Sequence, residues 1–171
     1  MPSQNGFATT FSTTALNENN WSADDGTTGG GRYNGTVDIA MTFGTVNIPT
    51  GATIDGIEIT AEGTGNPPAN KPEIFVNNGT SNSSNLSCNG SFTKSPDSQQ
   101  TWGSSTQLWG LSWTSLTASQ ITVTVDTSTM GGATIIWDFV GITIHYTEAP
   151  SGNLVKLRSG QVQLRSGKIS I

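Results

Sequence analysis

Two residue types that build many catalytic and metal sites are almost missing from this sequence. Cys88 is the only cysteine and His145 the only histidine among 171 residues. A lone cysteine excludes a disulfide within the chain and a cysteine-based zinc cluster, and a lone histidine excludes a histidine cluster for a transition metal. His145 falls on the polar side of an alternating run with no nucleophile motif beside it, which is typical of a solvated strand histidine. We therefore expect a protein that is not an enzyme, with no catalytic residues, no metal and no cofactor.

Charged residues and long apolar runs are scarce as well. Only 11% of the residues are charged, and no apolar run approaches the length of a membrane span. The first residues, MPSQNGFATT, have neither the basic start nor the apolar core of a signal peptide. Asp24 and Asp25 lack the ligand spacing of an EF-hand loop, so their glycine-rich surroundings indicate an ordinary loop. We expect synthesis in the cytoplasm and no association with a membrane.

The sequence is instead rich in Gly, Ser, Thr and Asn, which favour short strands joined by tight turns. Apolar and polar residues alternate along 36–43 and 121–126, and each pattern is typical of a half-buried strand. The run 72–77 is short and begins with Pro72, which predicts an edge strand because proline cannot donate to a sheet ladder.

Two longer alternating runs change phase along their length. The apolar set shifts near Gly56 in the run 53–62 and near Gly141 in the run 133–147. A β-bulge near each glycine would reset the register. Because no segment has the apolar period of a long helix, we predict an all-β fold: an antiparallel jelly-roll-like β-sandwich over residues 1–149, with a C-terminal β-rich arm over 150–171. Residues 1–15 fit either a first strand or a second arm.

Three of the five tryptophans lie in the stretch TWGSSTQLWGLSWT at 101–114. Trp109, Leu111 and Trp113 alternate with smaller or solvent-facing positions, and this pattern favours a core strand over a sugar platform. Trp102 lies outside the alternation. It is either the lid of the sandwich or a surface ring, and as a surface ring it is the candidate glycan contact.

Four phrases occur in order along the chain: NNWSADDG, FGTVNIPTGATIDGIEIT, TWGSSTQLWGLSWT and WDFVGITIHYT. Across residues 20–147 they resemble a β-sandwich domain of tailed-bacteriophage virion proteins. The resemblance implies a structural part of a virion and adds no catalytic residue. It implies a turn shaped by Pro49 and Gly51, with Trp109 and Trp113 packed beneath the core isoleucines. The residues predicted to form the structural core are Ile54, Ile57, Trp109, Leu111, Trp113 and Trp137.

The C-terminal arm carries a seven-residue repeat, NLVKLRSGQVQLRSGKISI. Each copy begins with an apolar, polar, apolar triplet, and Ser-Gly pairs separate the triplets, as in short strands joined by turns. Two and a half copies cannot bury a core alone, so we expect the arm to pack on its own sandwich or on a neighbouring subunit. The residues predicted to bind that partner are Val155, Lys156, Leu157, Arg158, Val162, Leu164, Arg165, Lys168, Ile169 and Ile171.

Charge favours the neighbouring subunit. Residues 1–150 hold twelve acidic and three basic side chains, a net charge of −9, whereas residues 151–171 hold four basic ones and no acid, a net charge of +4. A basic arm on an acidic body is steered towards another acidic body or lattice. Nucleic acid is not an expected partner, because the acidic body would repel phosphates.

The leading functional hypothesis is a capsid decoration, or cement, protein located in the virion. In this hypothesis the sandwich binds the outer head surface as a homotrimer, and the arm bridges subunits of the major capsid protein or another virion protein. A first alternative is a tail or fibre appendage protein of the same virion. A second is a carbohydrate-binding module in which Trp102 and the loop TSNSSNLSCNGS at 80–91 face a glycan.

Overall fold

The computed structural model describes residues 1–11, 31–34, 39–44, 46–66, 71–94, 96–126, 128 and 134–150. Almost all regular structure in these ranges is antiparallel β-sheet, with one helix of four residues. The elements are β1 (Ser3–Phe11), β2 (Gly31–Asn34), β3 (Ile39–Phe43), β4 (Thr53–Asn66), β5 (Glu73–Asn77), β6 (Leu86–Ser87), β7 (Ser98–Gly103), α1 (Ser115–Ala118), β8 (Thr122–Asp126) and β9 (Thr134–Thr147).

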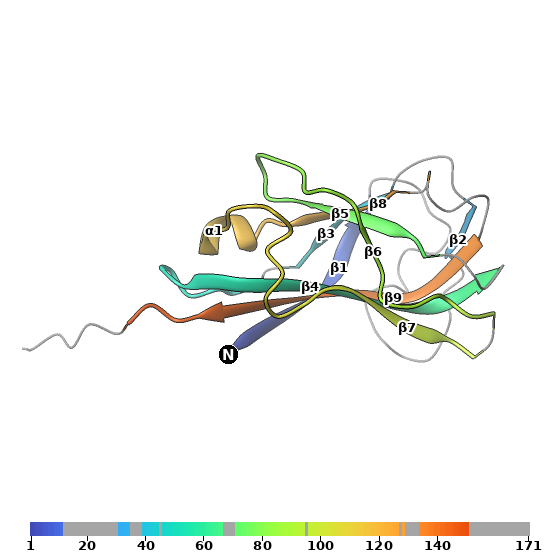
Figure 1. Cartoon of the computed structure of the whole chain (residues 1–171), viewed down its shortest axis with the longest axis horizontal. Helices are drawn as coiled ribbons and strands as arrows, with labels where there is room; N and C mark the ends of the chain where they lie inside the picture. The colour runs from blue at the N-terminus through green and yellow to red at the C-terminus, as the bar shows by residue number, and fades with distance from the viewer. Residues whose placement is uncertain are drawn as a thin grey trace, which may run out of the picture.

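The strand order is that of a jelly roll. With β2 set aside, the first strand pairs with the last (β1 with β9), the second with the seventh (β3 with β8), the third with the sixth (β4 with β7) and the fourth with the fifth (β5 with β6). These nested pairs form two layers, β1-β9-β4-β7 and β3-β8-β5-β6, which Figure 1 shows one above the other. The predicted all-β jelly-roll-like sandwich is confirmed.

The two layers are joined along one side by β1. Its first half pairs with β9 from Ser3 to Phe7, and its second half pairs with β3 from Ala8 to Phe11. The register shifts between Ala8 and Thr10, so a local irregularity lets one strand cross from one layer to the other. Of the two readings left open for the N-terminus, the described part of 1–15 is a strand.

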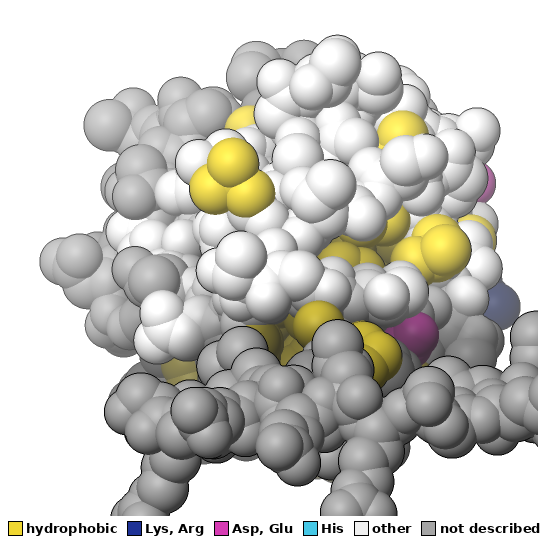
Figure 2. Space-filling view, turned by 90° about the vertical axis from the view of Figure 1, so that its left-hand side faces the viewer, with side chains coloured by type: hydrophobic (Ala, Val, Ile, Leu, Met, Phe, Trp, Pro, Cys, Tyr) yellow, Lys and Arg dark blue, Asp and Glu magenta, His cyan; other side chains and the backbone are white. Residues whose placement is uncertain are grey.

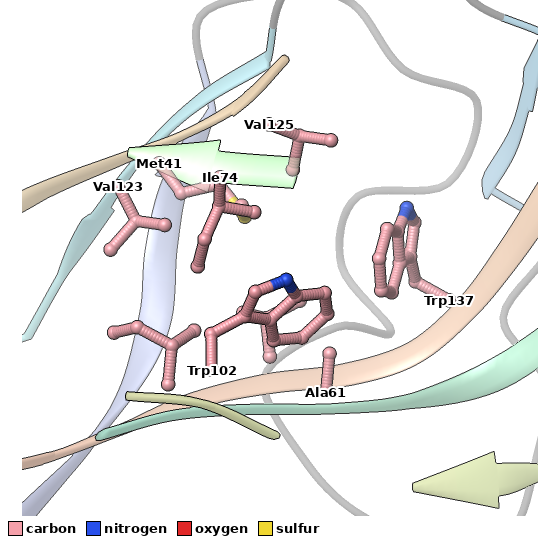
Figure 3. Close-up of a pocket in the computed structure, with 9 residues that line it drawn as sticks. Met41, Ala61, Ile74, Trp102, Val123, Val125 and Trp137 are labelled. Atoms are coloured by element: carbon pink, nitrogen blue, oxygen red, sulfur yellow. The ribbon is translucent and has the colours of Figure 1, made fainter. Parts of the chain in front are cut away.

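The core lies between the layers and is built by the predicted alternation. Isoleucines of β4, valines of β8 and most apolar residues of β9 point inward, as period-two strands with one covered face require. At its centre lies an apolar cavity of about 10 Å³, between the two tryptophans and the upper valines in Figure 3. A void of this size and lining stays dry. Its lining comprises Met41, Ile59, Ala61, Ile74, Trp102, Val123, Val125, Trp137 and Val140.

Both predicted phase changes are β-bulges. Asp55 is the extra residue of β4, because Ile54 pairs with Tyr146 and Gly56 pairs with the next residue, His145. In β9 the extra residue is Asp138, three positions before the predicted Gly141, and its carboxylate is fully buried. An inserted residue reverses the inside and outside positions that follow it, which explains why the apolar set changes sides.

Two predicted strands differ in the structure. Residues 72–77 do form a strand, but β5 is not an edge, because β6 pairs with its first two residues on the side opposite β8. Residues 108–113 form no strand: they belong to a loop that docks across the end of the sandwich. Their alternation arises because the turns of this loop direct every second side chain toward the core. A period-two pattern alone cannot distinguish such a loop from a strand.

Candidate interaction site

Trp102 is part of the core, so the prediction of a surface ring for glycan is wrong. Its side chain is 1% exposed and points inward from β7, and its indole Nε1 donates a hydrogen bond of 3.0 Å to the Pro72 carbonyl. Its ring lies 6.2 Å from Phe92 and 6.4 Å from Trp137. The alternative reading, the lid of the sandwich, describes it well, because it closes the core between β7 and the segment before β5.

Trp109 fastens the loop 104–113 to β4. Its backbone is left-handed, with a φ of 58°, and its buried indole donates to the Ile57 carbonyl over 2.9 Å. The Ile57 N–H donates in turn to the Gln107 carbonyl over 3.0 Å. Since β7 ends at Gly103, the loop takes over the backbone groups of β4 that β7 no longer pairs. Trp109 is therefore a core residue, as predicted, but it reaches the core from a loop.

The same loop exposes apolar side chains at the end of the sandwich that carries α1. Leu108 is 39% exposed and Leu116, on the helix, is 67% exposed. Leu111 and Trp113 are half-buried against the core, so the prediction that they lie inside holds only in part. Figure 2 looks at this end and shows hydrophobic side chains in several small groups separated by polar atoms. Such small groups are ordinary for a protein surface.

A groove lies between β6 and β7, where the two layers meet at their edges. It has a volume of about 270 Å³, slightly below the usual range for small-molecule sites. Its lining offers hydroxyl and amide groups and no charged side chain. The lining residues are Leu86, Ser87, Asn89, Thr101, Gly103, Ser104 and Gln107. The groove thus includes part of the predicted glycan-facing loop 80–91 but no aromatic platform.

Two carboxylates lie on neighbouring strands of the upper layer, one at the start of β5 and one at the end of β8. Glu73 of β5 pairs directly with Asp126 of β8, and the Asn85 amide donates to both. Ser128 donates to Asp126 through both its hydroxyl and its backbone N–H. The hydrogen bond from the Ser128 side chain, helped by that from Asn85, lowers the pKa of Asp126 below its ordinary value of 3.8. These donors offset the repulsion expected between like charges on paired strands.

The single cysteine and the single histidine both have enclosed side-chain atoms. Cys88 is buried, and burial raises the pKa of its thiol, which disfavours the reactive thiolate. His145 is half-buried, and within the described structure its Nε2 is enclosed without a hydrogen-bond partner, so the prediction of a solvated histidine is wrong for this atom. Within the described ranges, no group of three or more His, Cys, Asp or Glu side chains is arranged to hold a metal ion.

The remaining predicted residues divide into two groups. Ile54, Ile57 and Trp137 are buried in the core as predicted. The turn at 49–52 forms as the resemblance implied, with the Ala52 N–H donating to the Pro49 carbonyl over 3.0 Å. The partner-binding residues of the arm, 155–171, lie outside the described residues, as do Asp24 and Asp25.

Sequence reasoning missed the residues that cover the edge of β7. Phe92 is 1% exposed and stacks edge-on against Trp137 at 5.1 Å. It lies in the segment 88–93, where apolar residues are isolated and follow no period. The only available signal was the presence of a large aromatic residue in a polar loop, which favours burial.

Comparison of the chain with protein-family models, with curated proteins and with solved structures found no match. No helix among the residues that the structure describes is long and apolar enough to cross a membrane.

Proposed function

We propose that this chain is a structural protein of a tailed-phage virion, and specifically a capsid decoration protein that binds the outer head surface. The observation that carries the proposal is the nested strand order β1-β9-β4-β7 over β3-β8-β5-β6. This jelly-roll order recurs in viral capsid proteins and in lectin domains. The phrases at 20–147 that resemble phage virion proteins favour the first of these two classes.

The distribution of charge supports a bridging role for the arm. The acidic body and the arm of net charge +4 attract each other between copies, and the arm adds alternating apolar residues that strands use for pairing. The body is the folded unit, with a continuous core in its described part, that would bind the head surface. The arm would extend from it to a neighbouring subunit. In the proposed assembly, a homotrimer on the head is linked to its neighbours through residues 151–171.

Electron microscopy of virions tests this proposal. Gold-labelled antibody against the chain should decorate the head, and purified protein added to undecorated heads should raise the temperature at which they release DNA. A chain ending at Pro150 should bind less and protect less. Gold on the tail would support the appendage alternative instead, and an absence of gold from virions would overturn the virion proposal.

The groove between β6 and β7 is the observation that favours the second alternative, a carbohydrate-binding module. Its hydroxyl and amide groups are those that bind sugar hydroxyls. Binding on a glycan array that disappears in Gln107→Ala, while Trp113→Phe outside the groove still binds, would favour this function over decoration. Binding to no glycan would remove it.

A further inference from the structure

The chain itself covers two strand edges of the described structure: the outer edge of β7 and the part of β5 that β6 does not pair. Along β7, Asn89 donates its N–H to the Thr101 carbonyl over 2.9 Å, and its side chain accepts from the Thr101 N–H. Along β5, Ser83 and Val76 exchange hydrogen bonds of 2.8 and 2.9 Å. We call these two edges, with residues 78–93 over them, the covered flank. Covering edges in this way prevents unwanted strand pairing.

Another edge is the first half of β1, residues 3–6, which pairs with β9 on one side only and which we call the open edge. Tyr146 donates to the Pro2 carbonyl over 3.2 Å, so this pair is hydrogen-bonded. In an antiparallel ladder every second residue bonds the same neighbour, so Gln4 and Gly6 bond β9. The backbone groups of Ser3 and Asn5 consequently point away from β9.

No strand of the described structure receives the outward groups of Ser3 and Asn5, and both residues are exposed. One position further along, the outward carbonyl of Phe7 is taken by the Gly44 N–H at 3.2 Å. The edge is therefore satisfied at Phe7 and open before it. Residues 3–6 themselves hold no charged side chain and no proline, two features that block pairing along exposed edges; Pro2 lies just before them.

The side chains beside the open edge suit an apolar strand. Phe7 lies on the outer face, 46% exposed, with its ring 6.3 Å from that of Phe139. On the inner face, Gly6 lies against the buried Val46 and Ile142. A strand added here would place one side chain beside Phe7, where cross-strand aromatic and β-branched or aliphatic pairs are stabilising.

We propose that the open edge binds the C-terminal arm of a second copy of this chain, through one of the triplets 155–157, 162–164 or 169–171. This inference rests on the proposed assembly function and names the surface that the arm uses. The triplets have the apolar, polar, apolar pattern that the edge accepts, and their flanking lysines and arginines match the acidic body.

The direction of the strands favours a second copy over the chain's own arm. β9 ends at Thr147 near the start of β1, so the shortest path for the chain's own arm along β1 is parallel to it, and an antiparallel path needs a further turn. The arm of another copy has no such restriction and can pair in the antiparallel sense, which is more stable per residue.

Asn5→Pro in the full chain tests the inference. Proline removes only an N–H that β9 does not use, and edge positions tolerate it. Asn5→Ala is the matched control, because it keeps the N–H. Analytical ultracentrifugation should show concentration-dependent assembly of the wild type and of Asn5→Ala. For Asn5→Pro the association constant should be at least about tenfold lower than for the wild type. Thermal unfolding at low concentration checks that the fold is retained.

Hydrogen exchange gives a second readout that does not depend on a variant. The Asn5 amide should be protected in concentrated wild-type protein and should exchange quickly after dilution, whereas the Gln4 amide should be protected in both. Equal assembly of Asn5→Pro and wild type, a wild type that stays monomeric at every concentration, or fast exchange of Asn5 in the assembly would each overturn the inference. None of these results would change whether gold-labelled antibody decorates the head, so the proposed virion function is tested independently of this inference.

Discussion

The covered flank and the open edge complete the same jelly roll in different ways. On the covered flank, residues 78–93 lie over β5 and β7 and satisfy their outward backbone groups. At the open edge, β1 joins the two layers but leaves the outward groups of Ser3 and Asn5 without a strand in the described structure. Within the described residues, the chain therefore covers one side of the sandwich with its own backbone and leaves the outward groups of residues 3–6 uncovered.

The covered flank is also the better anchored of the two. Phe92, Trp102 and Trp137 form an aromatic cluster beneath it, and Pro72 accepts the Trp102 indole hydrogen bond. At the open edge the nearest large side chain, Phe7, is nearly half exposed. Stability is therefore concentrated where the edge is covered, whereas the open edge contributes mainly an exposed surface.

The largest effect should come from the phenylalanines of the two regions. Phe92→Ala should lower the free energy of unfolding by about 4 kcal/mol, because it empties a fully buried site. Phe7→Ala should cost less than about 1 kcal/mol, because much of that ring already contacts water. Urea denaturation of both variants measures the difference. Equal losses would contradict the contrast between the regions.

Glycines with a left-handed backbone give the next effect. Gly103 has a φ of 77°, and a Cβ there would collide with the Ile57 carbonyl, whereas Gly79 has a φ of 86° and open space around it. Gly79→Ala should cost about 1–2 kcal/mol, the ordinary penalty of this conformation. Gly103→Ala should cost about 1–3 kcal/mol more, because it adds overpacking. Thermal and urea unfolding of the pair check the difference, and a smaller loss for Gly103→Ala would refute the tight approach.

Cys88 reports on opening of the covered flank. Its buried thiol accepts no reagent until residues 88–93 lift from β7, and its raised pKa lowers the thiolate fraction further. A thiol-specific reagent at pH 8 should therefore label the native protein at least about tenfold more slowly than the urea-unfolded chain. Phe92→Ala should restore much of the rate. Rapid labelling of the native wild type would show that the flank is not closed.

The smallest effect concerns Asp126 and pH. Its folded-state pKa is depressed by Ser128 and Asn85, so its contribution is present above the ordinary value of 3.8 and is lost as pH falls through the folded value. Because the carboxylate is solvent-screened, Asp126→Asn should cost less than about 0.5 kcal/mol at pH 7. Urea denaturation at pH 7 and pH 3 should show the difference from wild type shrinking at the lower pH. A difference that grows at pH 3 would reverse the assigned sign.

Much of the fold could be predicted because it depends on local alternation. Period-two patterns identified the inward faces of β4, β8 and β9, and their phase changes marked both bulges, although Asp138 was displaced from the predicted Gly141. The same reasoning placed Trp109 correctly in the core but gave it a strand. It left Trp102 undecided, because a ring outside an alternating run can face either way until its neighbours are known.

The candidate surfaces could not be predicted in the same way. The groove joins residues 86–89 to residues 101–107 across two layers, and the open edge depends on which strands flank β1. Residues 3–6 carry no local sign of their position in the sheet, and the one sign in residues 72–77 was misleading. Pro72 suggested an edge, yet the next strand, β6, folds back beside the start of β5.

The amino-acid sequence by itself determined the fold class, the inward face of most strands, the bulges and the separation of an acidic body from a basic arm. These features follow from the local periodicity of apolar residues, which extends over a few positions, and from net charge, which is a sum over the residues of each segment. Only the tertiary structure decided the nested strand order, the burial of Trp102 and Phe92, and which strand edges are covered within the described residues. Those features require contacts between residues far apart in the chain, and the free energy of such contacts is set by packing across the layers.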